Sequence, residues 1–150
     1  MKFINPQNII ASFGLKAGYH VTDLGCGSGF YTLAAAKAVG NTGRVAAVDV
    51  QDSKLTAAKS ITLQNGLSNV EVYKADLEKP FDGIPHGGED AVIVASILHE
   101  VKNREALLKN VYALLKTKGH VLVVDWKAEH TLFGPAMEKR ISQEDGRKTF

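Results

Sequence analysis

Short apolar runs alternate along this chain with longer stretches in which apolar residues recur at helical spacing. The short runs predict five strands, at residues 20–24, 44–50, 69–75, 90–95 and 120–126. The longer stretches predict helices at residues 6–13, at 30–39, from Asp52 or Ser53 to about Asn65, and after Asn103, with a weaker helical signal after Ser142. Strands that alternate with helices favour a parallel sheet covered on both faces.

The connections between these elements are rich in glycine and proline. Residues 77–89 contain several of both and predict a loop, and residues 118–119 predict a turn before the last strand. Right-handed crossovers place the loop after every strand at the same edge of a parallel sheet. Residues that bind a ligand are therefore expected in the loops that follow the strands.

The composition is that of an ordinary globular domain. At 150 residues, with 45% hydrophobic and 23% charged residues, the chain is long enough to bury one core. A net charge of +2 gives no reason to expect nucleic acid or an anionic membrane as a partner. The single cysteine, Cys26, excludes a disulfide framework, and no stretch is typical of a signal peptide or a membrane helix. We expect one domain over residues 1–150, located in the cytoplasm.

Three glycines at alternate positions follow the first predicted strand. Gly25, Gly27 and Gly29 lie between that strand and a helix that begins at Phe30. Glycine lets the backbone adopt positive φ and approach a ligand closely. The helix N-terminus adds unpaired N–H groups and a partial positive charge. This arrangement is typical of a loop that binds a nucleotide-like cofactor.

The spacing of these glycines narrows the choice of cofactor. A nicotinamide-binding loop carries Gly-x-Gly-x-x-Gly, whereas here Phe30 stands where the last of those glycines would be. An acidic residue, Asp23, lies two positions before the first glycine. This combination resembles the first motif of class I S-adenosylmethionine-dependent methyltransferases.

Four further segments carry the same resemblance, which covers residues 5 to about 141. Asp49 ends the second predicted strand, 20 residues after Gly29, and residues 75–77 follow the third strand with an acidic residue in the middle. Residues 114–119 are similar to the leucine-rich, glycine-ended turn that precedes the fifth strand of the family. Residues 96–101 resemble the small-molecule branch, near the ubiquinone/menaquinone-biosynthesis type methyltransferases.

The resemblance implies a Rossmann-like, doubly wound α/β sheet of five parallel strands in the order 3-2-1-4-5, with S-adenosyl-L-methionine as the cofactor. Asp23, or the carbonyl groups of the loop after it, would receive the ammonium group of the cofactor. Asp49 would accept both ribose hydroxyls, and Asp76 would lie beside the adenine amino group. The predicted cofactor-binding residues are Asp23, Gly25, Cys26, Gly27, Gly29, Asp49, Val50, Gln51, Asp76, Leu77 and Ser96.

Two residues are candidates for acid–base catalysis. His99 and Glu100 follow the fourth strand at the ligand edge, although either could equally cap the next helix or face solvent. Cys26 is expected to be a small residue that the loop tolerates, and Trp126 either walls a pocket or packs in the core. The remaining histidines lack the spacing of metal ligands, so no metal site is expected; they are His20, His86, His120 and His130.

The leading hypothesis for function is methyl transfer from S-adenosylmethionine to an oxygen, carbon or nitrogen atom of a small molecule. Methyltransferases that act on exocyclic amines of nucleic-acid bases carry an Asn/Asp-Pro-Pro-aromatic element after strand four, and residues 95–98 do not resemble it. Two alternatives stay open. The chain could bind the cofactor without turnover, or it could be a nicotinamide-dependent oxidoreductase.

The end of the sequence departs from the family pattern. The family's sheet usually has seven strands, whereas only 23 residues follow Lys127, so we expect a truncated form. The predicted fifth strand would then have an exposed apolar edge unless residues 128–150 or another subunit covers it. A homodimer through this edge is therefore expected.

Overall fold

A computed structural model describes residues 4–129 and 131–150 of the chain. Five parallel strands form one sheet in the order β3-β2-β1-β4-β5, as predicted. The strands are β1 (His20–Leu24), β2 (Arg44–Asp49), β3 (Val70–Lys74), β4 (Glu89–Ala95) and β5 (Leu115–Val124). The α-helices are α1 (Pro6–Phe13), α2 (Phe30–Val39), α3 (Asp52–Gln64), α4 (Arg104–Leu114) and α5 (Gln143–Thr149).

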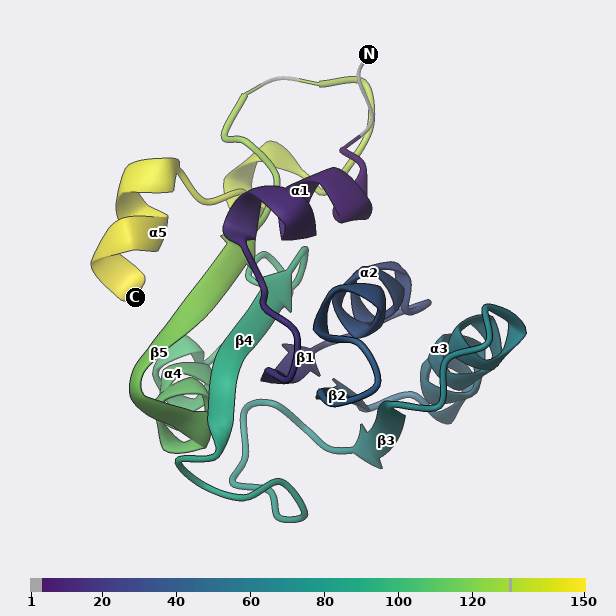
Figure 1. Ribbon diagram of the computed structural model, residues 1–150. Helices are drawn as coiled ribbons and strands as arrows, with labels where there is room; N and C mark the ends of the chain where they lie inside the picture. The colour runs from purple at the N-terminus through teal and green to yellow at the C-terminus, as the bar shows by residue number, and fades with distance from the viewer. Residues whose placement is uncertain (1–3, 130) are drawn as a thin grey trace.

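Helices cover both faces of this sheet (Figure 1). Helices α1, α2 and α3 pack on one face, where small residues such as Ala35 and Ala58 are fully buried. Helix α4 packs on the other face through Leu107, Val111 and Leu114. Side chains of a strand alternate between the two faces, and both faces are covered, so most residues of β1, β2 and β4 are buried.

Local signals explain where α1 and α4 begin, and where α1 ends, but not where α3 begins. Pro6 is the first residue of α1, and the helix stops at Gly14, whose φ of +82° suits glycine. Asn103 caps α4 through a hydrogen bond from the backbone N–H of Ala106 to Oδ1. Helix α3 differs from the prediction, because its N-cap is Gln51 and neither Asp52 nor Ser53 caps it. Asp52 is instead inside the first turn and pairs with Lys74.

The last strand begins earlier than the sequence predicts. Leu115 already pairs with Glu89, but the next pair joins His120 to Ala91, so the register shifts between them. The turn predicted at residues 118–119 lies within this irregularity, and Lys118 has a φ of +67°. The strand also ends at Val124, which leaves Asp125 and Trp126 in the loop at the carboxyl edge.

The residues after β5 add two short helical pieces. A 3-10 helix spans Met137–Lys139, and α5 is capped by the Ser142 hydroxyl, which accepts a hydrogen bond from Asp145 N–H. Ile141 and Phe150 pack against the apolar cluster on the α4 face. Among the described residues β5 hydrogen-bonds as a strand to β4 alone, so the C-terminal segment covers one face of β5 but adds no strand to its edge. No helix in the described part of the chain is long and apolar enough to span a membrane.

Candidate functional site

The glycine-containing loop after β1 is held against the end of β2. The backbone N–H groups of Gly25 and Cys26 both donate to the carbonyl oxygen of Val48, at 2.8 and 2.9 Å. Gly29 is the N-cap of α2 with a φ of +87°, and a Cβ at this residue would lie 2.6 Å from the Cα of Ala58. Glycine is therefore required here both for its backbone conformation and for the close approach of α2 to α3.

Asp49, at the carboxyl end of β2, connects the loop to the next helix. Its Oδ2 accepts a hydrogen bond from the N–H of Gly27 at 3.1 Å, and its Oδ1 accepts one from the N–H of Gln51 at 3.0 Å. The side chain is nearly buried, and it lines both cavities described below. A carboxylate oxygen has more than one acceptor site. Asp49 can therefore hold the loop and still accept hydrogen bonds from ligand hydroxyls.

Two adjoining cavities open at the carboxyl edge of the sheet, with volumes of about 350 and 300 Å³. They share five lining residues, which are Gly25, Asp49, Gln51, Ile97 and Glu100. The larger cavity is lined in addition by Pro6, Cys26, Gly27, Phe30, Tyr31, Lys54, Ala95 and Ser96. The smaller cavity is lined in addition by Val50, Ala75, Asp76, Leu77, Glu78 and Val101. Together they form an elongated site that crosses the ends of β1, β2, β3 and β4.

The charges around this site are mainly negative. Four carboxylates line the two cavities, whereas Lys54 is the one lysine or arginine among the residues that line them. A backbone hydrogen bond from Glu78 and the nearby Lys79 keep the pKa of Asp76 below its ordinary value. The site therefore favours a ligand that carries positive charge.

Asp23 occupies a different place from the one that the sequence suggests. Its side chain is buried behind the loop and lines neither cavity. One carboxylate oxygen accepts a hydrogen bond from the Thr32 hydroxyl at 2.6 Å, which ties β1 to α2. Burial raises the pKa of Asp23 to about 6. The carboxylate thus contacts Thr32 of α2 and lies outside the lining of both cavities.

Cys26 has the environment of an inert thiol. Burial, followed by the charges of Asp23 and Asp49, raises the pKa of Cys26 to about 12. The thiolate is the nucleophilic form of cysteine, and such a pKa leaves very little of it at neutral pH. The environment fits the role that the sequence suggests, a small side chain that the loop accommodates.

Ser96 lies at the point where β4 ends and the site begins. It has a φ of +57°, in the left-handed region that non-glycine residues rarely adopt. Its N–H donates to the carbonyl oxygen of Val124 at 2.6 Å, and the residue lines the larger cavity. Strained backbone of this kind is common at functional sites.

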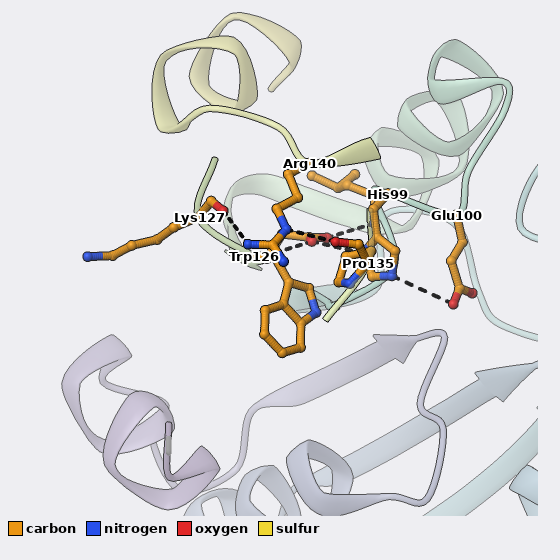
Figure 2. Close-up of polar contacts among 8 residues, drawn as sticks. His99, Glu100, Trp126, Lys127, Pro135 and Arg140 are labelled. Carbon is orange, nitrogen blue, oxygen red and sulfur yellow. Dashed lines mark hydrogen bonds and ion pairs between the residues drawn. The ribbon is translucent and has the colours of Figure 1, made fainter. Parts of the chain in front are cut away.

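His99 and Glu100 lie at different depths of the loop after β4. Glu100 lines both cavities, and its side chain is 75% exposed. The His99 side chain is only 10% exposed and lies behind Glu100, with Nε2 at 3.7 Å from Glu100 Oε1. In the view of Figure 2 the His99 ring stands between Trp126 and Glu100. The other ring nitrogen, Nδ1, lies 2.9 Å from Oδ1 of Asp125.

The structure brings most of the predicted cofactor-binding residues together at the carboxyl edge of the sheet. Nine of the eleven predicted cofactor-binding residues line a cavity, and the two that do not are Asp23 and Gly29. Sequence reasoning missed Phe30, Tyr31 and Lys54, which begin α2 and α3 and whose place on the ligand side follows from the helix N-termini. It also missed Asp125, because that residue was read as part of the last apolar strand.

No group of three or more metal-ligating side chains occurs among residues 4–129 and 131–150. His20 and His120 lie on β1 and β5, and His86 lies in the loop before β4. His130 lies outside the described residues.

Comparisons with known proteins agree with this geometry. A family model described as a methyltransferase domain matches residues 15–148. Over 135 residues the chain is 32% identical to the ubiquinone/menaquinone biosynthesis C-methyltransferase of Pseudoalteromonas translucida, which covers 88% of this chain and 53% of that protein. The chain thus spans about half the length of this curated relative.

Two further relatives match a larger and a smaller share of the chain. A crystal structure described as a SAM-dependent methyltransferase from Aquifex aeolicus superimposes with a TM-score of 0.87 at 32% identity, covering 97% of this chain and 76% of that one. A 23S rRNA uracil C5-methyltransferase of Acinetobacter baylyi is 38% identical over 101 residues, covering 61% of this chain and 22% of that protein.

Proposed function

The chain belongs to the family of S-adenosylmethionine-dependent methyltransferases, and from that premise we propose that it transfers the methyl group of S-adenosyl-L-methionine to a small molecule. The observation that carries the proposal is the position of Asp49, where the two cavities meet at the end of β2. A carboxylate there can accept both hydroxyls of a ribose. The adenine would then extend into one cavity and the methionine part into the other.

The smaller cavity suits the adenine. Val50 and Leu77 supply apolar contacts, and the Asp76 carboxylate can accept a hydrogen bond from an exocyclic amino group. The larger cavity suits the methionine part, because Gly25 and Gly27 allow close approach of the backbone. Since Asp23 is buried, we assign the ammonium group to the loop carbonyls, and we assign to Asp23 and Gly29 the support of the loop.

Electrostatics favour this cofactor over a nicotinamide dinucleotide. S-adenosylmethionine carries a sulfonium, an ammonium and one carboxylate group, so its net charge is positive, whereas a dinucleotide carries a negatively charged pyrophosphate. The four carboxylates that line the cavities would attract the first and repel the second. The oxidoreductase alternative is therefore not favoured.

The chemistry leaves the protein two tasks. The cofactor supplies a methyl group on a sulfonium, which is already a good leaving group. The protein has to align an acceptor atom with that methyl group and, where the acceptor carries a proton, remove it. We propose Glu100 as the residue that faces the acceptor and His99 as the residue that supports it, since Glu100 is exposed and lines the larger cavity, to which the methionine part with its methyl group is assigned, and His99 lies behind it.

The acceptor is proposed to be small. The relative from Pseudoalteromonas translucida is named for carbon methylation in quinone biosynthesis, so a hydroquinone that lacks a ring methyl group is the first acceptor to try. The match to the rRNA methyltransferase covers only 61% of this chain and 22% of that protein. The near-neutral net charge of +2 also gives little attraction for RNA.

The test is calorimetric titration with S-adenosylhomocysteine. We expect saturable binding to the wild-type chain and a loss of about tenfold or more in affinity for Asp49→Ala, because the ribose hydrogen bonds and the support of Gly27 are lost together. Asp52→Ala is the matched control, since Asp52 is an exposed carboxylate three residues away that lines neither cavity. Equal affinities for the two variants would contradict the proposal.

A second measurement separates an enzyme from a binding module. The same preparation is incubated with S-adenosylmethionine and a panel of hydroquinone, phenol and amine acceptors, and release of S-adenosylhomocysteine is followed. Binding of the cofactor without release on any acceptor would favour a module that does not turn over.

We also propose that the chain associates with a second copy through the outer edge of β5. Within the described residues that edge has no partner strand, and Val121 to Val124 are apolar. Size-exclusion chromatography with light scattering is expected to show a dimer, and a monomer at all concentrations would refute it. The cytoplasmic location stays a prediction.

A further inference from the structure

Asp125 joins the loop after β4 to the loop after β5. Its Oδ2 accepts a hydrogen bond from the backbone N–H of Leu98 at 2.8 Å, and its Oδ1 accepts one from its neighbour Trp126 at 2.8 Å. The same Oδ1 lies 2.9 Å from Nδ1 of His99. With a side chain only 8% exposed, Asp125 is a buried acceptor that fastens the loop after β4 to the end of β5.

These contacts determine which nitrogen of His99 carries the proton. Both oxygens of Asp125 already accept backbone N–H groups, so the carboxylate faces the ring as an acceptor and Nδ1 must donate. A neutral imidazole that is protonated at Nδ1 has its lone pair at Nε2. Nε2 is the atom that lies 3.7 Å from Oε1 of Glu100.

A lone pair at this position has a chemical consequence for Glu100. An ionised carboxylate gains nothing from a neighbouring lone pair, whereas a protonated carboxyl group can donate its O–H to it. Nε2 and Oε1 are 3.7 Å apart, beyond hydrogen-bond distance, so the exposed Glu100 side chain would have to move closer to donate to this lone pair once it had taken a proton.

We propose that Asp125 is a positioning residue, which fixes the tautomer and orientation of His99 so that Glu100 can remove a proton from the methyl acceptor. The inference rests on the proposed function and deepens it, because it names the acceptor class as one with a dissociable O–H, N–H or acidic C–H group. In the reaction the acceptor–hydrogen bond breaks and its proton passes to a Glu100 oxygen. The freed electron pair forms the bond to the methyl carbon, and the electrons of the broken carbon–sulfur bond stay on sulfur, which becomes a neutral thioether.

The inference is tested by nitrogen NMR of ¹⁵N-histidine-labelled protein at about pH 8, above the ordinary pKa of histidine. The His99 signals are assigned by their loss in His99→Gln. We expect a protonated Nδ1 and an unprotonated Nε2 in the wild-type chain, which requires no variant to fold. In Asp125→Asn an amide cannot accept at both side-chain positions, so we expect this single tautomer to be lost.

Two control variants separate positioning from a general loss of structure. Asp90→Asn removes a carboxylate that accepts a backbone N–H from His20 at the opposite edge of the sheet, and it should leave the His99 signals unchanged. Glu100→Gln should also retain the proton on Nδ1, because Asp125 is intact. An unprotonated Nδ1 in the wild-type chain, or an unchanged tautomer in Asp125→Asn, would overturn the inference.

Turnover supplies a readout that a merely structural role would not move. With an acceptor found in the panel, Asp125→Asn is expected to lower kcat about tenfold or more with little change in KM for the acceptor. Loss of the tautomer with an unchanged kcat would also overturn the inference. Titration of the same samples with S-adenosylhomocysteine tests the proposed function by itself, so a wild-type chain that keeps the tautomer but binds no cofactor would refute the function and not the geometry.

Discussion

The carboxyl edge of the sheet has two halves that are built in different ways. In the first half, formed by β1, β2 and β3, backbone contacts predominate. The loop N–H groups of Gly25 and Cys26 donate to a β2 carbonyl, and Gly29 lets α2 approach α3. In the second half, formed by β4 and β5, side-chain contacts hold the loops in place. Asp125 joins the two loops there, and Arg140 holds the segment that follows β5.

The Arg140 cluster illustrates the second kind of construction (Figure 2). The guanidinium group lies over the Trp126 ring, 5.6 Å from its centroid. It also donates hydrogen bonds to four backbone carbonyl groups, those of Lys127, Glu129, Phe133 and Pro135. One side chain thus organises a segment that has little regular secondary structure of its own.

The difference between the halves predicts how each responds to substitution. A loop built from backbone fails when a Cβ is added, even though no functional group is removed. Loops built from side chains fail when one specific group is lost, and the rest of the fold is expected to stay intact. The experiments below test this contrast in decreasing order of the expected effect.

Gly29→Ala should have the largest effect on stability. The new Cβ would lie 2.6 Å from the Cα of Ala58, and the residue would be held at a φ of +87°. Left-handed strain and overpacking together should lower the free energy of unfolding by about 3 kcal/mol or more. The measurement is urea denaturation of the purified variant.

Gly27→Ala is the matched control for this experiment. Gly27 also has a positive φ, of +52°, but a Cβ there would meet no atom within 4 Å. The loss should be about 1 kcal/mol, from strain alone. Similar losses in the two variants would show that packing of α2 against α3 is not what Gly29 provides.

Asp23, in the first half, should make the stability of the protein depend on pH. Burial raises the pKa of Asp23 to about 6, so between the unfolded value near 4 and about 6 the folded state binds the proton more tightly than the unfolded state does. The free energy of unfolding should therefore fall as the pH rises through this interval and level off above it. The contribution is at most about 3 kcal/mol.

Asp23→Asn isolates that contribution, because the amide has no charge to desolvate and its oxygen can still accept a hydrogen bond from Thr32. The measurement is urea denaturation of both proteins at steps between about pH 4 and 7. The difference in stability between wild type and variant should change across the interval. A difference that is the same at every pH would show that Asp23 does not titrate there.

Arg140→Ala should have a smaller and more local effect, in the second half. Loss of the charged hydrogen bonds and of the contact with Trp126 should cost about 1 to 2 kcal/mol, mostly in the segment after β5. Limited proteolysis should cut this segment faster, while affinity for S-adenosylhomocysteine should stay within about twofold. Arg147→Ala, at an exposed residue of α5, is the control.

If Arg140→Ala weakened cofactor binding as much as Asp49→Ala, the two halves would not be independent. Cofactor binding in the first half would then depend on the segment after β5, although no described residue of that segment lines either cavity. The measurement is titration of both variants with S-adenosylhomocysteine under the same conditions.

The sequence predicts the backbone-built half well. Glycine spacing and the apolar pattern are local signals, and they give β1, α2 and the residues around Asp49 almost to the residue. Side-chain partners distant in sequence carry no such local signal. His99 and Asp125 are 26 residues apart, and nothing in either segment alone indicates that they meet.

Tertiary contacts also decide the roles of two acidic residues near this loop. The sequence allows either Asp23 or the loop carbonyls to receive the ammonium group of the cofactor, and the contact between Asp23 and Thr32 depends on how α2 packs. The cap of α3 was assigned to Asp52 or Ser53, whereas Asp52 is drawn into a pair with Lys74 of β3. In both cases tertiary contacts decide between two roles that local sequence permits equally.

At Ser96, where the backbone is strained, selection for thermal stability and selection for an ordered cavity wall favour different residues. Glycine would adopt the φ of +57° without cost, so a population of variants selected only for heat resistance should accumulate Ser96→Gly. The same population would acquire a loop free to sample more conformations at the wall of the larger cavity. If serine is retained at this position under thermal selection, then selection acts on ligand binding and not on the stability of the fold.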